Sequence, residues 1–102
     1  MVFHMVLLRV KKSVTKPKLA KVMDSIGALK KVIPAMASYA WGPYSSPEGL
    51  NKGFTHGFCM TFKTVKQRDG YLSHPKHENV KMAVLSILDG GIEAVVAFDF
   101  EG

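Results

Sequence analysis

The chain has 102 residues, with 14 Lys or Arg against 8 Asp or Glu, so its formal net charge is +6. This length allows a single domain, residues 1–102, with a modest core, and a hydrophobic content of 47% excludes intrinsic disorder. The single cysteine, Cys59, excludes an internal disulfide and zinc sites built from cysteine pairs.

No segment near the start of the chain has the pattern of an export signal or a membrane span. The longest apolar run there, residues 5–8, is cut by Arg9 and is too short for either. We therefore expect a soluble, cytoplasmic protein with no integral membrane association.

The first third of the chain predicts a strand followed by a helix. Residues 2–11 are apolar on both parities, which is typical of a strand covered on both faces. Thr15 as N-cap and Pro17 in the first turn indicate a helix over residues 15–33, which Pro34 ends. Its apolar stripe consists of Leu19, Val22, Met23, Ile26 and Ile33.

The remaining elements alternate between extended and helical patterns. In chain order they are a strand at 36–44, a loop at 45–52, a strand at 53–62, a short helix at 64–73, a helix at 76–88 and a strand at 92–100. The order β-α-β-β-α-β predicts an α+β fold of the ferredoxin-like plan, an antiparallel four-stranded sheet with its helices on one face.

A second copy of the chain is expected from the composition of the sheet as a whole. In the last strand, for example, one parity is entirely apolar: Ile92, Ala94, Val96, Phe98 and Phe100. Helices on one face of the sheet leave the other face bare, and that face is too apolar to remain in water. We therefore expect a homodimer in which the two bare sheet faces meet.

Much of the positive charge lies in residues 11–31. Nucleic acid or an anionic membrane surface could bind such a stretch, and a solvated helix face would have the same composition. Because residues 11–31 contain no aromatic side chain for base stacking, we expect no nucleic-acid partner and prefer the solvated face. The lysines concerned are Lys11, Lys12, Lys16, Lys18, Lys21, Lys30 and Lys31.

Two of the four histidines are predicted to lie on neighbouring central strands. His4 and His56 each sit among apolar residues of one parity, so they can point to the same side of the sheet, where residues 71–77 can roof them. Convergent polar groups in an apolar pocket are typical of a small-molecule site, whereas a single histidine is more often a hydrogen-bonded core residue. Three histidines could also bind a metal. No carboxylate accompanies them at a helical i, i+4 spacing, so we expect no metal site.

The segment from Tyr71 to His77 is the most informative stretch of the chain. Pro75 pushes His74 out of the helical region and can open the next helix, so we interpret His74 as a cap or a buried hydrogen-bonding residue. His77 falls in the first turn of that helix, where the helix dipole would lower its pKa and favour the neutral base. Tyr71 ends the preceding helix and could donate a hydrogen bond.

These residues together resemble the stress-responsive dimeric α/β-barrel (Dabb) family. The resemblance covers essentially the whole chain. It rests on Phe3-His4-Met5-Val6, Ile33-Pro34-Ala35-Met36, Tyr39 to Gly42, Phe54-Thr55-His56, Tyr71-Leu72-Ser73-His74-Pro75-Lys76-His77 and Val96-Ala97-Phe98-Asp99-Phe100.

Within the family, the chain is similar to plant polyketide cyclases of the olivetolic acid cyclase type. The resemblance implies a cofactor-free intramolecular aldol condensation of a linear β-polyketo thioester, with His77 as general base and Tyr71 as hydrogen-bond donor. It implies that His4 and His56 line the pocket. The turn of the first helix that lines the alkyl pocket of such cyclases carries Val22, Met23 and Ile26 here.

Two other functions fit the same residues. The resemblance also covers non-catalytic stress proteins with heat stability or antimicrobial activity, for which a cationic surface suits anionic cell envelopes. Dimers of the ferredoxin-like plan also serve as modules that bind haem or other ligands, since a fold does not select a function.

Overall fold

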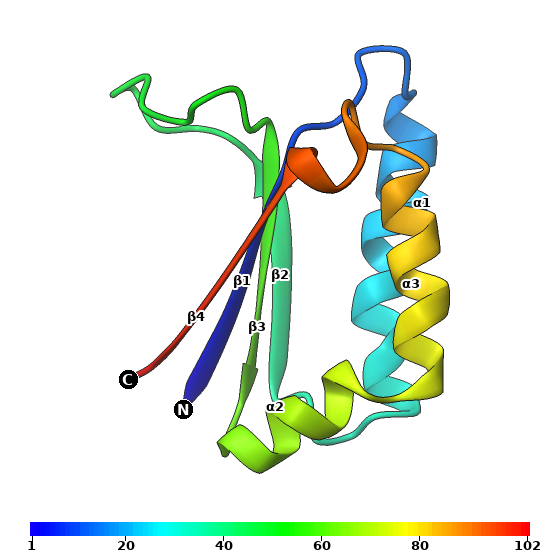
Figure 1. Cartoon of the computed structure of the whole chain (residues 1–102), viewed down its shortest axis with the longest axis vertical. Coiled ribbons are helices and arrows are strands. Elements are labelled where there is room, and N and C mark those ends of the chain that lie inside the picture. The colour runs from blue at the N-terminus through cyan, green and yellow to red at the C-terminus, as the bar shows by residue number, and fades with distance from the viewer.

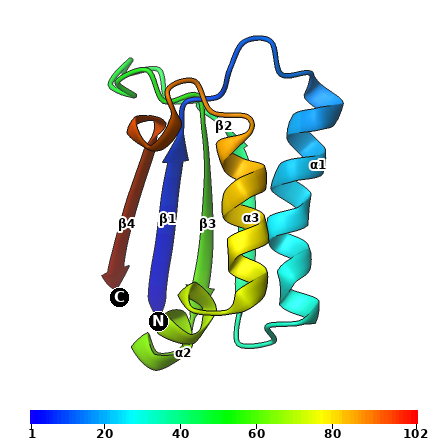
Figure 2. The same cartoon turned by 45° about the vertical axis from the view of Figure 1, so that its right-hand side comes forward.

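Four strands form one antiparallel sheet in the order β2-β3-β1-β4, and helices cover only one of its faces (Figures 1 and 2). The computed structural model describes residues 1–102. The elements are β1 (Val2–Leu8), α1 (Lys16–Gly27), β2 (Ser38–Pro43), β3 (His56–Phe62), α2 (Val65–Leu72), α3 (Pro75–Leu85) and β4 (Val95–Glu101), with short 3₁₀ turns at Ala28–Lys31 and Gly91–Ala94. The predicted ferredoxin-like plan is confirmed.

The helix starts follow from local capping. The Thr15 hydroxyl accepts the backbone N–H of Lys18, and Pro17 occupies the first turn of α1, as predicted. The Thr64 hydroxyl caps α2 in the same way by accepting the N–H of Gln67. The α-helical part of the predicted 15–33 helix is shorter than expected, because it tightens into a 3₁₀ turn after Gly27.

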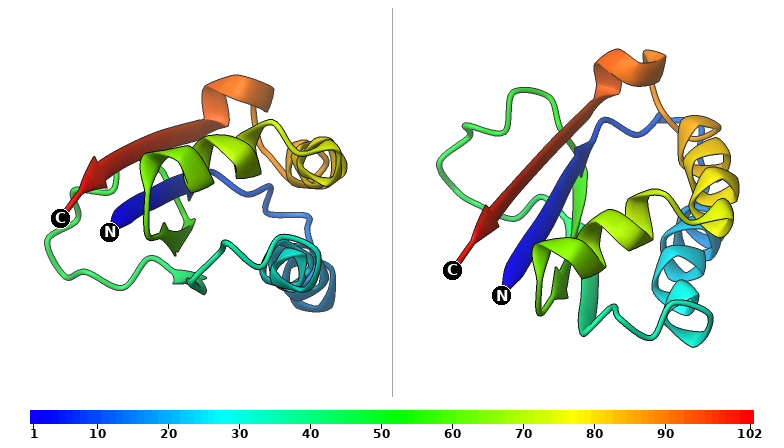
Figure 3. Two further views of the ribbon diagram at one scale, coloured as in Figure 1. Left: turned by 90° about the horizontal axis from the view of Figure 1, so that it is seen from below. Right: turned by 60° about the horizontal axis from the view of Figure 1, so that its bottom comes forward.

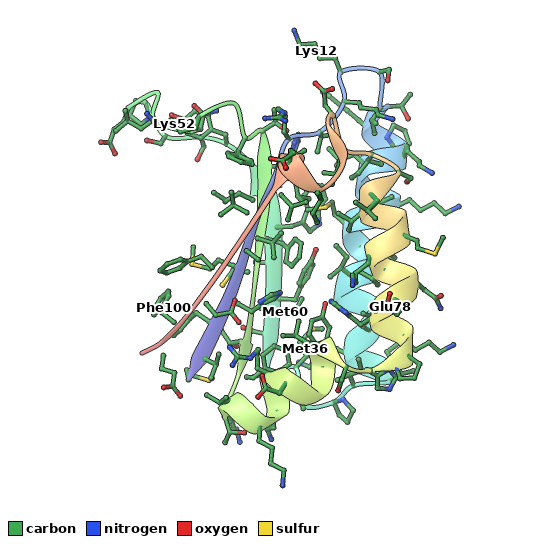
Figure 4. All side chains as sticks on the ribbon, in the orientation of Figure 1. Lys12, Met36, Lys52, Met60, Glu78 and Phe100 are labelled. Carbon is green, nitrogen blue, oxygen red and sulfur yellow. The ribbon has the colours of Figure 1, made fainter.

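The two longer helices lie side by side over one face of the sheet, and α2 crosses its end (Figure 3). Even-numbered residues of β1 point toward these helices and are buried, whereas Met5 and Leu7 point to the opposite, open face and are exposed. Met36 and Met60 lie between sheet and helices, where the core is (Figure 4).

Each of the four predicted strands has at least one wrong bound, and β2 spans Ser38–Pro43 rather than 36–44. β1 ends at Leu8 rather than residue 11, although Val10 still forms an isolated bridge with Leu88. β3 begins at His56 rather than 53, because Lys52 and Gly53 have positive φ angles in the preceding loop. These residues turn the chain instead of extending it.

The last strand begins three residues later than predicted. Gly90 and Gly91 adopt φ angles of 115° and 60°, and the chain then makes a 3₁₀ turn before β4 starts at Val95. The prediction that Ile92 and Ala94 belong to the last strand is therefore wrong. Ile92 is 74% exposed in the turn, whereas Ala94 is fully buried.

The open face of the sheet is apolar, as predicted. Phe98 is 63% exposed, and the rings of Phe3 and Phe100 stack with centroids 4.9 Å apart. Phe100 projects on the side of the sheet away from the helices (Figure 4). The exposed apolar side chains of this face are Met5, Leu7, Val96, Phe98 and Phe100.

Candidate active site

A cavity of about 230 Å³ lies between the sheet, the end of α2 and α3. Apolar side chains form most of its wall, among them Phe58 of β3 and Val80 and Val84 of α3. The polar side chains that line it are His4, Tyr71, His77 and Lys81. An apolar cavity with a few convergent polar groups is typical of a small-molecule site.

Tyr71 and His77 are brought together by the turn between two helices. Tyr71 is the penultimate residue of α2, and His77 lies in the first turn of α3. His74 caps α3, because its Nδ1 accepts the backbone N–H of Lys76 at 3.0 Å, and Pro75 opens the helix. The prediction of His74 as a cap is confirmed, and the resulting turn sets the two site residues edge to face, with ring centroids 4.8 Å apart.

Tyr71 is a protonated hydrogen-bond donor. Its side chain is 1% exposed, and burial raises its pKa to about 12. Its hydroxyl therefore keeps its proton at neutral pH and makes no hydrogen bond within the chain. A carbonyl oxygen of a ligand could take this donor.

His77 has the properties of a neutral base. Burial lowers its pKa below the ordinary 6.5, and the ammonium of Lys81 lowers it further, while Glu78 acts in the opposite direction. The direction agrees with the prediction, but burial rather than the helix dipole is its main cause. Nδ1 of His77 is buried without a hydrogen-bond partner, so the imidazole keeps hydrogen-bonding capacity for a ligand.

His4 forms a third polar group of the cavity, and its partner is a carboxylate. Nδ1 of His4 lies 2.7 Å from Oδ1 of Asp99, which faces it across the β1–β4 pair. The His4 ring also packs against Tyr71, with centroids 6.0 Å apart. Since an ionised carboxylate only accepts hydrogen bonds, Nδ1 carries a proton.

Asp99 and Arg68 are site residues that the sequence interpretation missed. Nη1 of Arg68 donates to Oδ2 of Asp99 at 2.8 Å. The sequence could have pointed to Asp99, because it is a lone carboxylate between Phe98 and Phe100 on a strand that pairs with β1. Nothing in the sequence singles out Arg68, because it is one of many polar residues in α2.

His56 lies elsewhere, although sequence parity placed it in the same pocket. It pairs with Leu8, four residues along β1 from His4, which is about 13 Å at the usual rise of a strand. Its Nδ1 contacts the Thr55 hydroxyl at 2.8 Å, and it borders a different hollow beside Leu7 and Gly57. The structure therefore separates His56 from His4, Tyr71 and His77.

The three residues of α1 that were expected to line an alkyl pocket are core residues. Met23 and Ile26 are fully buried and Val22 is 5% exposed, and none of them lines the cavity. Tyr39 fills the space beside α1, where its hydroxyl donates to the Met23 carbonyl at 2.6 Å and its ring packs on Gly27.

No group of three His, Cys, Asp or Glu side chains is close enough to hold a metal ion. None of the helices is long and apolar enough to cross a bilayer.

Comparison with known proteins agrees with the fold and adds a relative of known activity. Residues 2–102 match the Stress responsive A/B Barrel Domain family. A stress-response A/B barrel domain-containing protein of Arabidopsis thaliana is 31% identical over 101 residues, which cover 95% of this chain and 82% of that protein. Olivetolic acid cyclase of Cannabis sativa is 29% identical over 74 residues, 72% of this chain and 73% of the cyclase.

Solved structures show the same architecture. The crystal structure of a second Arabidopsis thaliana protein superposes with a TM-score of 0.90 at 28% identity, covering all of this chain and 95% of that one. A dimeric ferredoxin-like protein of unknown function from Jannaschia superposes with a TM-score of 0.88 at 21% identity, covering 99% and 98% of the two chains. Through its match from residue 2 to residue 102, the chain belongs to the Stress responsive A/B Barrel Domain family.

Proposed function

We propose that this chain is a cofactor-free acid–base enzyme that closes a linear β-polyketo thioester by intramolecular aldol condensation. One observation carries the proposal: the buried hydroxyl of Tyr71 and the imidazole of His77 lie side by side in an apolar cavity, and both keep hydrogen-bonding capacity for a ligand. The similarity to olivetolic acid cyclase supports the same reaction class.

The two side chains fit complementary roles in this reaction. The imidazole of His77 would remove the acidic proton between two carbonyls, while Tyr71 would donate to the thioester carbonyl oxygen and stabilise the enolate. The enolate carbon then bonds to a remote ketone carbon of the same molecule, and the new alkoxide takes the proton back from His77. Loss of water completes the condensation, and none of these steps needs an oxidant or a reductant.

The size of the cavity restricts the substrate. At about 230 Å³ it is smaller than a site for a drug-sized ligand, roughly 300–1,000 Å³. Because Tyr39 occupies the space beside α1, a long alkyl chain has no room on that side. We therefore propose a compact polyketide, or the reacting end of a longer one whose tail leaves past the exposed Ile92.

The test supplies the linear product of a polyketide synthase and separates the cyclised products by chromatography with mass detection. Wild type should cyclise it, whereas His77→Ala and Tyr71→Phe should each match the protein-free control. Tyr44→Phe is the matched control, because its hydroxyl accepts the Gly49 N–H in a loop outside this cavity. The proposal fails if wild type yields only the protein-free products, or if both site variants remain fully active.

We also propose that a second copy of the chain covers the open sheet face. The face carries Phe98 at 63% exposure and Phe100 at 43%, and the related Jannaschia structure is described as dimeric. Light scattering should give a dimer for wild type and a monomer for Phe98→Lys. Met82→Lys, which changes a 71% exposed residue of α3, should remain dimeric.

A second candidate function, binding to anionic cell surfaces without catalysis, is favoured by the lysines of residues 11–31. All seven are exposed and none is in an ion pair. Co-sedimentation with anionic vesicles should then weaken as salt rises, since the attraction is screened. Binding that is constant with salt would contradict this function.

A further inference from the structure

We propose that Arg68 is a positioning residue of the candidate site: it holds Asp99 against His4 and so keeps His4 neutral, with an unprotonated Nε2 toward the cavity. The proposal rests on the proposed function only in taking the cavity around Tyr71 and His77 as the site. Its readout is the state of the His4 ring, which is measured without substrate.

The two oxygens of the Asp99 carboxylate are divided between the two partners. Oδ1 lies 2.7 Å from Nδ1 of His4, and Oδ2 lies 2.8 Å from Nη1 of Arg68. With both oxygens held, the carboxylate cannot rotate without losing one charge-assisted contact. This matters because β4 is an edge strand, so no further strand restrains Asp99.

The burial of the three side chains makes their charge balance important. His4, Asp99 and Arg68 have side-chain exposures of 8%, 21% and 19%. Arg68 neutralises Asp99 in this mostly buried place. Without the guanidinium, the carboxylate would lack a permanent counter-charge, and the His4 imidazole would become the nearest group able to take up a proton.

The other groups around His4 do not substitute for Arg68. Tyr71 of α2 faces it as a neutral phenol, and His77 of α3 faces it as an imidazole whose own pKa is lowered by burial. Arg68 also donates through Nε to Asp69 at 2.8 Å. Because Asp69 is 62% exposed, that contact contributes little to the balance at His4.

For the site, the protonation of His4 decides whether its Nε2 accepts or donates a hydrogen bond. With Nδ1 protonated and the ring neutral, Nε2 of His4 accepts a hydrogen bond from a ligand hydroxyl or an enol. With an imidazolium, Nε2 would donate instead, and a second cation would stand beside the neutral base His77. Arg68 would therefore determine whether His4 accepts a hydrogen bond from a ligand or donates one to it.

The experiment records ¹⁵N spectra of histidine-labelled protein at one pH just above neutrality. Wild type should show His4 with one protonated and one unprotonated nitrogen, and Arg68→Met should show two protonated nitrogens. Lys66→Met is the matched control, because it removes one positive charge from an exposed position of the same helix. It should leave His4 unchanged, and Arg68→Lys should restore much of the wild-type pattern. His56 and His74 in the same spectra report whether the variants are folded.

The proposal is overturned if Arg68→Met leaves the His4 resonances as in wild type, or if Lys66→Met shifts them equally. Turnover separates this result from the proposed function. A change of His4 protonation in a protein that never cyclises polyketides would reject the enzyme function alone. A cyclase whose His4 is indifferent to Arg68 would reject the positioning role alone.

Discussion

The rings of Tyr71 and His77 meet edge to face at 4.8 Å, although a helix boundary separates the two residues. A single buried tyrosine or histidine could equally be a catalytic residue or a core residue. Here the two side chains meet inside one apolar cavity that His4 also lines, and Asp99 contacts His4.

The first prediction concerns the pH dependence of turnover. His77 must be neutral to act as a base, so activity is lost as the pH falls through its pKa, which lies below 6.5. Since Lys81 lowers this pKa, Lys81→Met should raise it and move the acid limb of kcat/KM to higher pH. Glu78→Gln should move the limb to lower pH, because Glu78 raises the pKa.

The control for this series is Lys76→Met, which removes an exposed lysine of α3 that does not act on His77. Its acid limb should coincide with that of wild type. A wild-type limb at or above the ordinary histidine value would contradict the assignment of His77 as the base.

The second prediction separates the two strand histidines. His4 lines the cavity and His56 does not, so His4→Ala should lower kcat/KM by about tenfold or more, the loss of roughly 1.5 kcal/mol or more of hydrogen bonding. His56→Ala should stay within about twofold of wild type, a cost near 0.4 kcal/mol. Equal losses in steady-state assays would mean that both histidines reach the substrate.

The third prediction tests whether the apolar face of α1 is core or pocket wall. Ile26 is fully buried, so Ile26→Ala should lower the free energy of unfolding by about 2–5 kcal/mol. Val32→Ala, at a 53% exposed position, should change it by less than about 0.5 kcal/mol. Urea unfolding measures both, and a small loss for Ile26→Ala would indicate that it borders open space.

The fourth prediction concerns the packing of Tyr39. A Cβ at Gly27 would lie 2.6 Å from a ring carbon of Tyr39, so Gly27→Ala should destabilise the protein by about 1–3 kcal/mol. Gly70→Ala is the matched case in α2, because a Cβ there meets no atom within 4 Å. It should stabilise by up to about 1 kcal/mol, since alanine favours the helix. Thermal unfolding that ranks the two variants in the opposite order would contradict this packing.

Local patterns predicted the element order and the turn between α2 and α3. The cap at His74 and Pro75 define this turn, and it brings Tyr71 at the end of α2 close to His77 in the first turn of α3. Alternation in β1 and β3 likewise predicted that His4 and His56 point to the same side of the sheet. These features depend on neighbours within a few residues.

The positions that the sequence did not predict are determined by contacts between residues far apart in the chain. Parity predicts the face of His56 but not its height on the sheet, which the register with Leu8 decides. Arg68 and Asp99 are 31 residues apart and meet only because α2 crosses the end of the sheet. The role of Met23 depends on Tyr39 occupying the space beside it. No local spacing reports any of these contacts.

The alternation of β1 has a consequence for how this sequence can change. His4 serves the cavity on one face, while Phe3 and Met5 belong to the opposite, open face. A substitution in β1 therefore affects one face at a time. Inserting or deleting a single residue between His4 and Leu8 would instead place these two residues on opposite faces, so that the imidazole could not enter the cavity while Leu8 remains in the core. The strand can vary in residue type, but its length is fixed by the site it carries.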